Sequence, residues 1–137
     1  MIPELTDAPA DCDLAALGAG LSAFNDADVG PAGRRALAIL LRDPSGGVAG
    51  GLSGYTAWGW LYVQWLWLAE PLRGQGWAGR LLKMAEAEAR VRGCHGAWID
   101  TFNPAALQAY RRAGYAVFGE LPGFPKGRTR SFLQKPL

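Results

Sequence analysis

The sequence has little of what metal sites, disulfide frameworks and membrane anchors require. It contains one histidine and two cysteines, Cys12 and Cys94, which form no CxxC pair. We therefore expect neither a structural zinc site nor a disulfide framework. The longest apolar run, residues 57–69, is interrupted by Gln64 and is shorter than the about 20 residues that cross a bilayer. The sequence thus predicts no metal and no membrane-spanning helix.

Charge of one sign is not concentrated in any part of the chain. The net charge is +2 and no block of like charges occurs, so the sequence does not indicate nucleic acid or an acidic membrane as a partner. Acids such as Glu4 and Asp7 stand where a secretory signal carries Lys or Arg. We expect a cytoplasmic protein with one domain, residues 1–137, because this length with 50% hydrophobic residues fits a single core.

Hydrophobic periodicity predicts a mixed α/β fold. Apolar residues at helical spacing predict helices at residues 13–24, 76–92 and 103–113. Extended apolar patterns predict strands at residues 36–41, 48–58, 61–68, 97–101, 115–121 and 129–134. Asp13 is expected to cap the first helix. The strand at 61–68 is apolar on both faces apart from Gln64, which predicts a central strand that is covered on both faces.

The junction between the strand at 61–68 and the next helix is the strongest candidate for a binding site. It reads Arg73-Gly74-Gln75-Gly76-Trp77-Ala78-Gly79. Free backbone N–H groups and the positive end of the helix dipole meet at such a junction, which favours an anion. Glycine at 74 and 76 lets a phosphate approach the backbone, and we expect Ala78 and Gly79 to let the first helical turn pack tightly on the strand.

Two other phosphate-binding motifs are weaker interpretations of this loop. Gly74, Gly76 and Gly79 satisfy GxGxxG, and Asp100 follows about 20 residues later, as the ribose-binding acid of a dinucleotide fold does. A hairpin precedes the loop, however, and little chain follows Asp100 to supply further parallel strands. A nucleoside-triphosphate loop is excluded because no Gly-Lys-Ser/Thr follows the glycines.

Two ordered motifs resemble those of the GCN5-related N-acetyltransferase (GNAT) family. The family's pyrophosphate loop, Arg/Gln-x-x-Gly-x-Gly/Ala, is matched by Arg73, Gly76 and Ala78. Its later signature, an Asn followed seven residues on by Tyr and then x-x-x-Gly-Phe/Tyr, is matched by Asn103, Tyr110, Gly114 and Tyr115. The resemblance covers residues 36–137. It implies an acyl-CoA N-acyltransferase fold, with a central, mostly antiparallel sheet that is flanked by helices and splayed beside the pyrophosphate loop.

The same resemblance implies direct transfer of an acetyl group from acetyl-CoA to a primary amine, without a metal. It places the pyrophosphate on the loop at 73–79 and the pantetheine against the backbone of Leu66, Trp67 and Leu68. It also places Asn103 beside the cofactor and makes Tyr110 the general acid, since a phenol with a reference pKa of about 10 can protonate a thiolate at neutral pH. Basic side chains that could neutralise the 3′-phosphate are Arg80, Lys83, Arg111 and Arg112.

The general base is the open role. The strand at 61–68, where many relatives carry a glutamate, offers only Gln64, whose amide is not a useful proton acceptor. Asp100 is the substitute candidate, and its alternatives are to cap the following helix or to meet solvent. The missing strand carboxylate motivates a second hypothesis, a non-catalytic acyl-CoA-binding or sensor module. The acceptor amine, on a small molecule or a peptide, is not identified by the sequence.

Aromatic residues gather around the central strand and on one later loop. Trp58, Trp60, Trp65 and Trp67 fit an aromatic acceptor pocket, a dimer face or ordinary core packing, so a homodimer stays open as a form of assembly. Phe124 and Lys126 lie on a loop rich in Pro and Gly, which fits one wall of an acceptor site or a solvated loop.

Overall fold

The computed structural model describes all residues, 1–137, and the chain divides into two compact units, Met1–Ala32 and Gly33–Leu137. The first unit holds one helix, α1 (Asp11–Val29), which confirms the helix expected at 13–24 and extends it at both ends. The predicted cap is wrong: Ala10 occupies the N-cap position without a side-chain hydrogen bond, and Asp13 lies inside the first turn. None of the helices combines the length and the hydropathy needed to cross a membrane.

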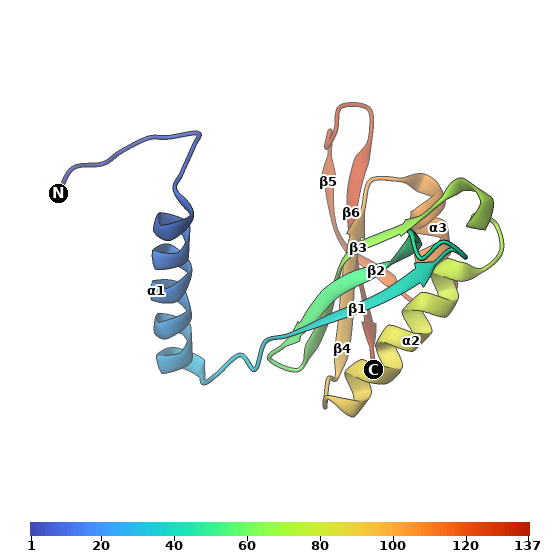
Figure 1. Cartoon of the computed structure of the whole chain (residues 1–137), viewed down its shortest axis with the longest axis horizontal. Helices are drawn as coiled ribbons and strands as arrows, with labels where there is room; N and C mark the ends of the chain where they lie inside the picture. Colours follow the sequence, from blue (N-terminus) through green and yellow to red (C-terminus); the bar gives the residue numbers. More distant parts are fainter. The chain divides into compact units, whose positions relative to one another are not determined.

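The second unit is a six-stranded sheet with two helices (Figure 1). Its strands are β1 (Arg35–Arg42), β2 (Val48–Ala57), β3 (Trp60–Leu68), β4 (Gly96–Thr101), β5 (Ala116–Pro122) and β6 (Thr129–Pro136). They lie in the order β1-β2-β3-β4-β6-β5, and only the β3–β4 pair is parallel. The predicted mixed α/β fold with a mostly antiparallel sheet is confirmed. This topology contradicts the dinucleotide interpretation, which requires a parallel sheet.

The connection from β3 to β4 contains a 3-10 turn, η1 (Glu70–Leu72), and helix α2 (Trp77–Val91), and helix α3 (Pro104–Arg112) follows β4. Helix α2 is amphipathic, and Gly93, with φ of +81°, follows its C-cap residue Arg92. Both helices pack in one core with the sheet: its buried members from the helices are Leu81, Leu82, Ala85, Ala89 and Tyr110, and from the strands Leu37, Leu52, Leu61, Val63, Ala97, Ile99 and Leu133.

A β-bulge at Gln64 changes the faces of β3 halfway along the strand. Gly54 of β2 opposes Val63 and Ser53 opposes Trp65, so Gln64 has no partner in the register. Before the bulge Leu61 and Val63 face the core, and after it Leu66 does. Trp65 and Trp67 are turned to the opposite face, where they are 69% and 54% exposed. The prediction that this strand is covered on both faces is therefore wrong for its second half.

The sheet opens immediately before the bulge. Strand β4 pairs with β3 only over Trp60–Val63 and continues against β6 up to Thr101. In Figure 1 the strands of the β1–β2–β3 group run at an angle to those of the β4–β6–β5 group. Residues after Val63 in β3 consequently have a strand partner on the β2 side alone. This interruption of the pairing, the gap between β3 and β4, extends to the end of β3, after which the chain continues into the loop before α2.

Candidate functional site

The loop between β3 and α2 presents a row of unused backbone donors. The N–H groups of residues 74–79 have no acceptor within the chain. Gly74 and Gly76 have φ of +74° and +78°, a conformation in which glycine is strongly favoured. The side chains of Arg73 and Gln75 hold the loop: Arg73 Nε donates to the carbonyl oxygen of Leu68 at 3.0 Å, and Gln75 Nε2 donates to that of Pro71 at 2.6 Å. The loop is therefore shaped for an anion at the N-terminus of α2.

These donors face a cavity of about 670 Å³ between α2 and α3. Added Cβ atoms at Gly74, Gly76 and Gly79 would meet nothing within 4 Å. The expected tight packing at Gly79 is thus wrong, because this residue leaves room for a ligand instead. The cavity is lined by Leu68, Gly74, Gly76, Trp77, Ala78, Gly79, Arg80, Lys83, Glu86, Ala105, Gln108, Ala109, Arg112 and Ala113.

Three of the four candidate basic residues contribute to this cavity. Arg80 and Lys83 come from α2 and Arg112 from α3, whereas Arg111 is not part of the lining. The guanidinium of Arg80 lies over the ring of Trp77, 4.0 Å from its centroid. The cavity thus combines an anion-binding loop with basic side chains and one aromatic surface.

The second half of β3 supplies unpaired backbone groups along the gap. The N–H of Ala69, just after β3, donates to the carbonyl oxygen of Ala49 in β2. The backbone groups of successive residues in an extended strand point to alternate sides. The backbone N–H and C=O groups of Trp67 therefore point towards β2, while those of Leu66 and Leu68 point into the gap. The Leu68 carbonyl accepts from Arg73, which leaves the N–H groups of Leu66 and Leu68 as donors on that side.

The residues of the second motif differ in what they do. Asn103 is the N-cap of α3, where its Oδ1 accepts from the N–H groups of Ala105 and Ala106 at 2.9 and 3.1 Å. It borders a second cavity, of about 360 Å³, beside the β5–β6 hairpin and not the larger one. Gly114, with φ of +96°, ends the helix. The structural roles of Asn103 and Gly114 at the two ends of α3 are therefore sufficient to explain these two residues of the motif.

Tyr110 has a buried ring and a hydroxyl with no hydrogen-bond partner in the chain. No completely buried side-chain oxygen is left unsatisfied, so this hydroxyl retains access to solvent or to a ligand. Burial, and secondly the nearby charge of Asp100, raises the pKa of Tyr110 to about 12. The phenol is accordingly protonated throughout the neutral range and is able to donate a proton.

Asp100 lies on β4 at the opening of the sheet. Arg130 of β6 donates from Nε and Nη2 to its Oδ1, and the hydroxyl of Tyr62 donates to Oδ2 at 3.4 Å. Its side chain is 9% exposed. Both alternative roles expected for Asp100 are therefore wrong, because Asn103 caps α3 and the carboxylate does not face solvent.

The sequence interpretation missed a buried charged cluster on the wall of the larger cavity. Glu86 of α2 is 2% exposed and accepts from the hydroxyl of Tyr115 at 3.0 Å and from Lys135 Nζ at 2.6 Å. Burial, then the Glu86 charge, raises the pKa of Tyr115. A signal was present: Glu86 follows Leu82 by one helical turn, so it stands on the apolar face of α2.

Comparison with known proteins gives consistent results. Residues 8–115 match the sequence model of the Acetyltransferase (GNAT) family. The chain is 50% identical over 115 residues to an acetyltransferase of Agrobacterium fabrum, covering 84% of each chain. It is 41% identical over 93 residues to the blasticidin-S acetyltransferase of Streptomyces morookaense, covering 67% of this chain and 68% of that protein.

A solved structure extends the similarity to the whole chain. The crystal structure of an acetyltransferase from Agrobacterium tumefaciens covers 100% of both chains, with 44% sequence identity and a TM-score of 0.96. The residues that match the family model include the anion-binding loop, α2 and the whole of α3. By its sequence, its fold and its relatives, this chain belongs to the GNAT acetyltransferase family.

Proposed function

We propose that the protein transfers the acetyl group of acetyl-CoA to a primary amine of a small molecule or peptide by direct attack. The observation that carries the proposal is the row of free N–H groups at residues 74–79, which faces a cavity of about 670 Å³ lined by Arg80, Lys83 and Arg112. Diphosphate and 3′-phosphate groups supply the negative charges that such a site binds. Cavities of this size hold ligands of cofactor dimensions.

In this proposal the cofactor follows the path from the loop into the gap between β3 and β4. The pyrophosphate binds the loop at 73–79, and the pantetheine extends along the free N–H groups of Leu66 and Leu68. These donors can also polarise the thioester carbonyl where negative charge develops. Asn103 has a smaller part than the family resemblance implies, since it borders the other cavity.

The chemistry requires two proton movements. The nitrogen of the neutral amine attacks the thioester carbon, the carbon–sulfur bond breaks, and the departing thiolate takes the proton of the Tyr110 hydroxyl. The proton released by the amine passes to Oδ2 of Asp100, directly or through water, because Oδ1 is engaged by Arg130. Holding both reactants in the gap supplies much of the acceleration.

The experiment that tests the proposal separates binding from transfer. Acetyl-CoA, with NADH as control, should raise the melting temperature, and Ala78→Glu should abolish this shift because its carboxylate repels the pyrophosphate. Ala78→Gln is the matched control, of equal size and without charge, and should retain part of the shift. Release of free thiol from acetyl-CoA in the presence of a panel of amines then measures transfer.

A non-catalytic acyl-CoA sensor remains the second candidate, because Gln64 stands where a glutamate would be the base. The two functions predict different outcomes of the same assay. A sensor would show the thermal shift without amine-dependent thiol release. No shift with acetyl-CoA would contradict both.

A further inference from the structure

The face of the sheet opposite α2 and α3 carries a row of aromatic side chains across three strands. Tyr55, Tyr62 and Trp98 are register partners on β2, β3 and β4. The rings of Tyr55 and Tyr62 meet edge to face at 5.5 Å, and those of Tyr62 and Trp98 stack at 4.0 Å. The three rings therefore contact one another, and the hydroxyl of the central one, Tyr62, donates to Asp100.

Beyond the bulge, the same face carries two tryptophans that have no such partner. Trp65 and Trp67 make no ring or cation contact within the chain, in contrast to Trp60, Trp77 and Trp98. Their register partners on β2 are the small residues Ser53 and Gly51. No large side chain on β2 therefore stands directly opposite the two exposed indoles. Exposed apolar surface of this kind, concentrated beside a reaction site, marks a binding surface.

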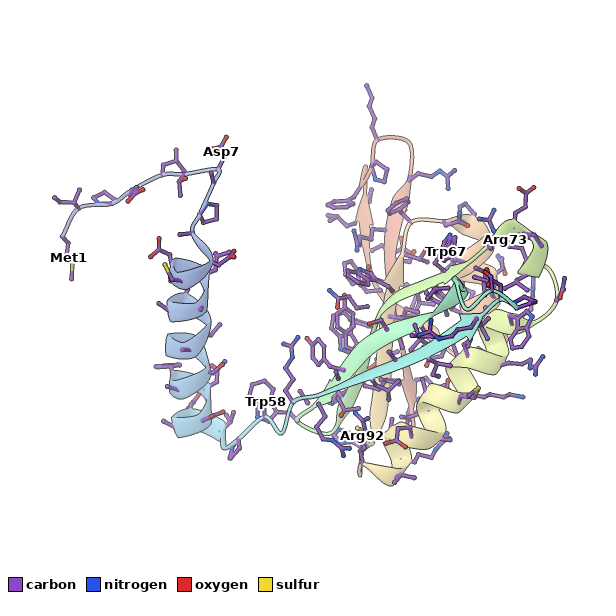
Figure 2. All side chains as sticks on the ribbon, in the orientation of Figure 1. Met1, Asp7, Trp58, Trp67, Arg73 and Arg92 are labelled. Atoms are coloured by element: carbon purple, nitrogen blue, oxygen red, sulfur yellow. The ribbon has the colours of Figure 1, made fainter.

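The position of the two tryptophans relates them to the acceptor and not to the cofactor. The cofactor cavity lies on the α2–α3 side, whereas Trp65 and Trp67 lie on the other face and flank Leu66, whose N–H opens into the gap. Figure 2 places Trp67 near Arg73, at the end of β3 from which the anion-binding loop begins. An acceptor that enters from this face would pass the indole of Trp65 before reaching the gap.

The charges on this face indicate what kind of acceptor it takes. A planar cation already rests on one of its rings, because the guanidinium of Arg34 lies 3.8 Å from the centroid of Tyr55. The guanidinium of Arg130, which binds Asp100, lies 4.9 Å from the centroid of Phe124 in the β5–β6 loop. Oδ2 of Asp100 accepts only one long hydrogen bond, of 3.4 Å, from Tyr62. This oxygen can therefore accept a shorter and stronger hydrogen bond from an ammonium group. Trp65 on β3 and Asp100 on β4 both come just after the last β3–β4 pair, Val63 and Ile99. An open indole and an available carboxylate oxygen at the same opening of the sheet suit an amine that carries a planar ring.

We propose that the acceptor is an amine tethered to a planar aromatic ring, with the ring stacked on Trp65 and the amine directed to Oδ2 of Asp100. This inference rests on the proposed acetyl transfer and specifies its substrate class. It distinguishes such amines from aliphatic polyamines and amino sugars, which have no ring face to stack. Trp65 determines specificity through the ring, while Asp100 holds the amine.

The test compares two amines of nearly equal size that differ in aromaticity. Binding of 2-phenylethylamine and of 2-cyclohexylethylamine is measured by calorimetry on the protein saturated with CoA, so that turnover is not needed. We expect about a tenfold tighter dissociation constant for the aromatic amine, as one favourable stacking contact supplies. Trp65→Leu should reduce this ratio to near one while leaving the affinity for CoA unchanged.

Trp58→Leu is the matched control, because this exposed tryptophan lies at the β2–β3 turn, the other end of β3 from Trp67 (Figure 2). It should keep the tenfold ratio. Equal binding of the two amines, no binding of either, or an unchanged ratio in Trp65→Leu would overturn the inference. So would a change in molecular mass by light scattering in Trp65→Leu, because the face would then be an interface between copies.

Thiol release from acetyl-CoA distinguishes this inference from the proposed function. Transfer to both amines at equal kcat/KM would leave the acetyltransferase proposal standing and overturn the assignment of the acceptor. A retained binding preference without any thiol release would support the aromatic site and contradict the catalytic proposal.

Discussion

Arg130 donates both of its hydrogen bonds to the same oxygen of Asp100, Oδ1, and leaves Oδ2 with a single bond of 3.4 Å from Tyr62. The carboxylate is thus oriented through one oxygen while the other keeps lone pairs free. A fixed carboxylate with an available oxygen at the opening of the sheet has the geometry of a proton acceptor. We propose that Asp100 takes the place of the strand glutamate which the chain lacks.

Replacing Asp100 with Asn should lower kcat/KM about 100-fold at pH 7, because the amide keeps the shape and cannot accept the proton. The loss should shrink by pH 9.5, where more of the amine is neutral without help from the protein. Initial rates of thiol release at the two pH values check this. Glu120→Gln, at an exposed carboxylate on β5, is the control. A loss of equal size at both pH values would contradict a role as base.

Replacing Tyr110 with Phe should lower kcat about 100-fold and leave the KM for acetyl-CoA unchanged, because only the proton donor is removed. Tyr115→Phe is the matched control from the same motif. The hydroxyl of Tyr115 donates a hydrogen bond to the buried carboxylate of Glu86. Tyr115→Phe should therefore lower the free energy of unfolding and keep its turnover at temperatures where the variant is folded. Steady-state kinetics at varied acetyl-CoA concentration measures both constants. An unchanged kcat in Tyr110→Phe would show that Tyr110 is not the general acid.

The buried phenol of Tyr110 also predicts how stability depends on alkaline pH. Its pKa is about 12 in the folded chain against 10.0 unperturbed, so between these values the folded state keeps a proton that the unfolded state loses. The free energy of unfolding should therefore fall as pH rises from 10 to 12, by on the order of 2 to 3 kcal/mol from this group. Urea unfolding at pH 8, 10 and 11 should show a smaller loss in Tyr110→Phe, and equal losses would refute the assignment.

The order of the elements in the second unit was predictable because it depends on local signals. Period-2 and period-3.6 patterns, with glycines at the turns, place each strand and helix of this unit within a few residues of its observed bounds. The same holds for the anion-binding loop, since Gly74 and Gly76 need their positive φ whatever the tertiary context. The predicted end of the first helix was less accurate, because none of its residues is buried and no capping side chain marks its start.

The features that were not predictable depend on contacts distant in sequence. The bulge exists because Gly54 lets Tyr62 approach: an added Cβ would lie 1.9 Å from the Tyr62 carbonyl oxygen. No residue near Gln64 in the sequence indicates a bulge, so the pattern predicts a regular strand that is covered on both faces, and not the exposure of Trp65 and Trp67. The pairing of Asp100 with Arg130 likewise requires knowing that β6 lies beside β4.

Removing the cation of the buried cluster should be strongly destabilising. Lys135→Met would leave the Glu86 carboxylate buried with only the Tyr115 hydroxyl. An uncompensated buried charge costs about 3 to 5 kcal/mol. Denaturant unfolding at pH 7 measures the loss, and the double variant Glu86→Gln with Lys135→Met should recover much of it, because the charge itself is gone. No recovery in the double variant would mean that Lys135 acts through packing instead.

Gly79→Ala separates the needs of the fold from those of the ligand. This glycine lies in the first turn of α2 without a positive φ, and an added Cβ would touch nothing in the chain. The substitution should stabilise the protein by about 0.4 to 1 kcal/mol, yet weaken acetyl-CoA binding several-fold, because the methyl group enters the cavity. Gly76→Ala, at φ of +78°, should instead lose about 1 to 2 kcal/mol of stability. Thermal melts with and without acetyl-CoA measure both effects. If Gly79→Ala gained stability and bound acetyl-CoA normally, the first turn of α2 would not contact the cofactor, and the proposed path of the pyrophosphate would have to be abandoned.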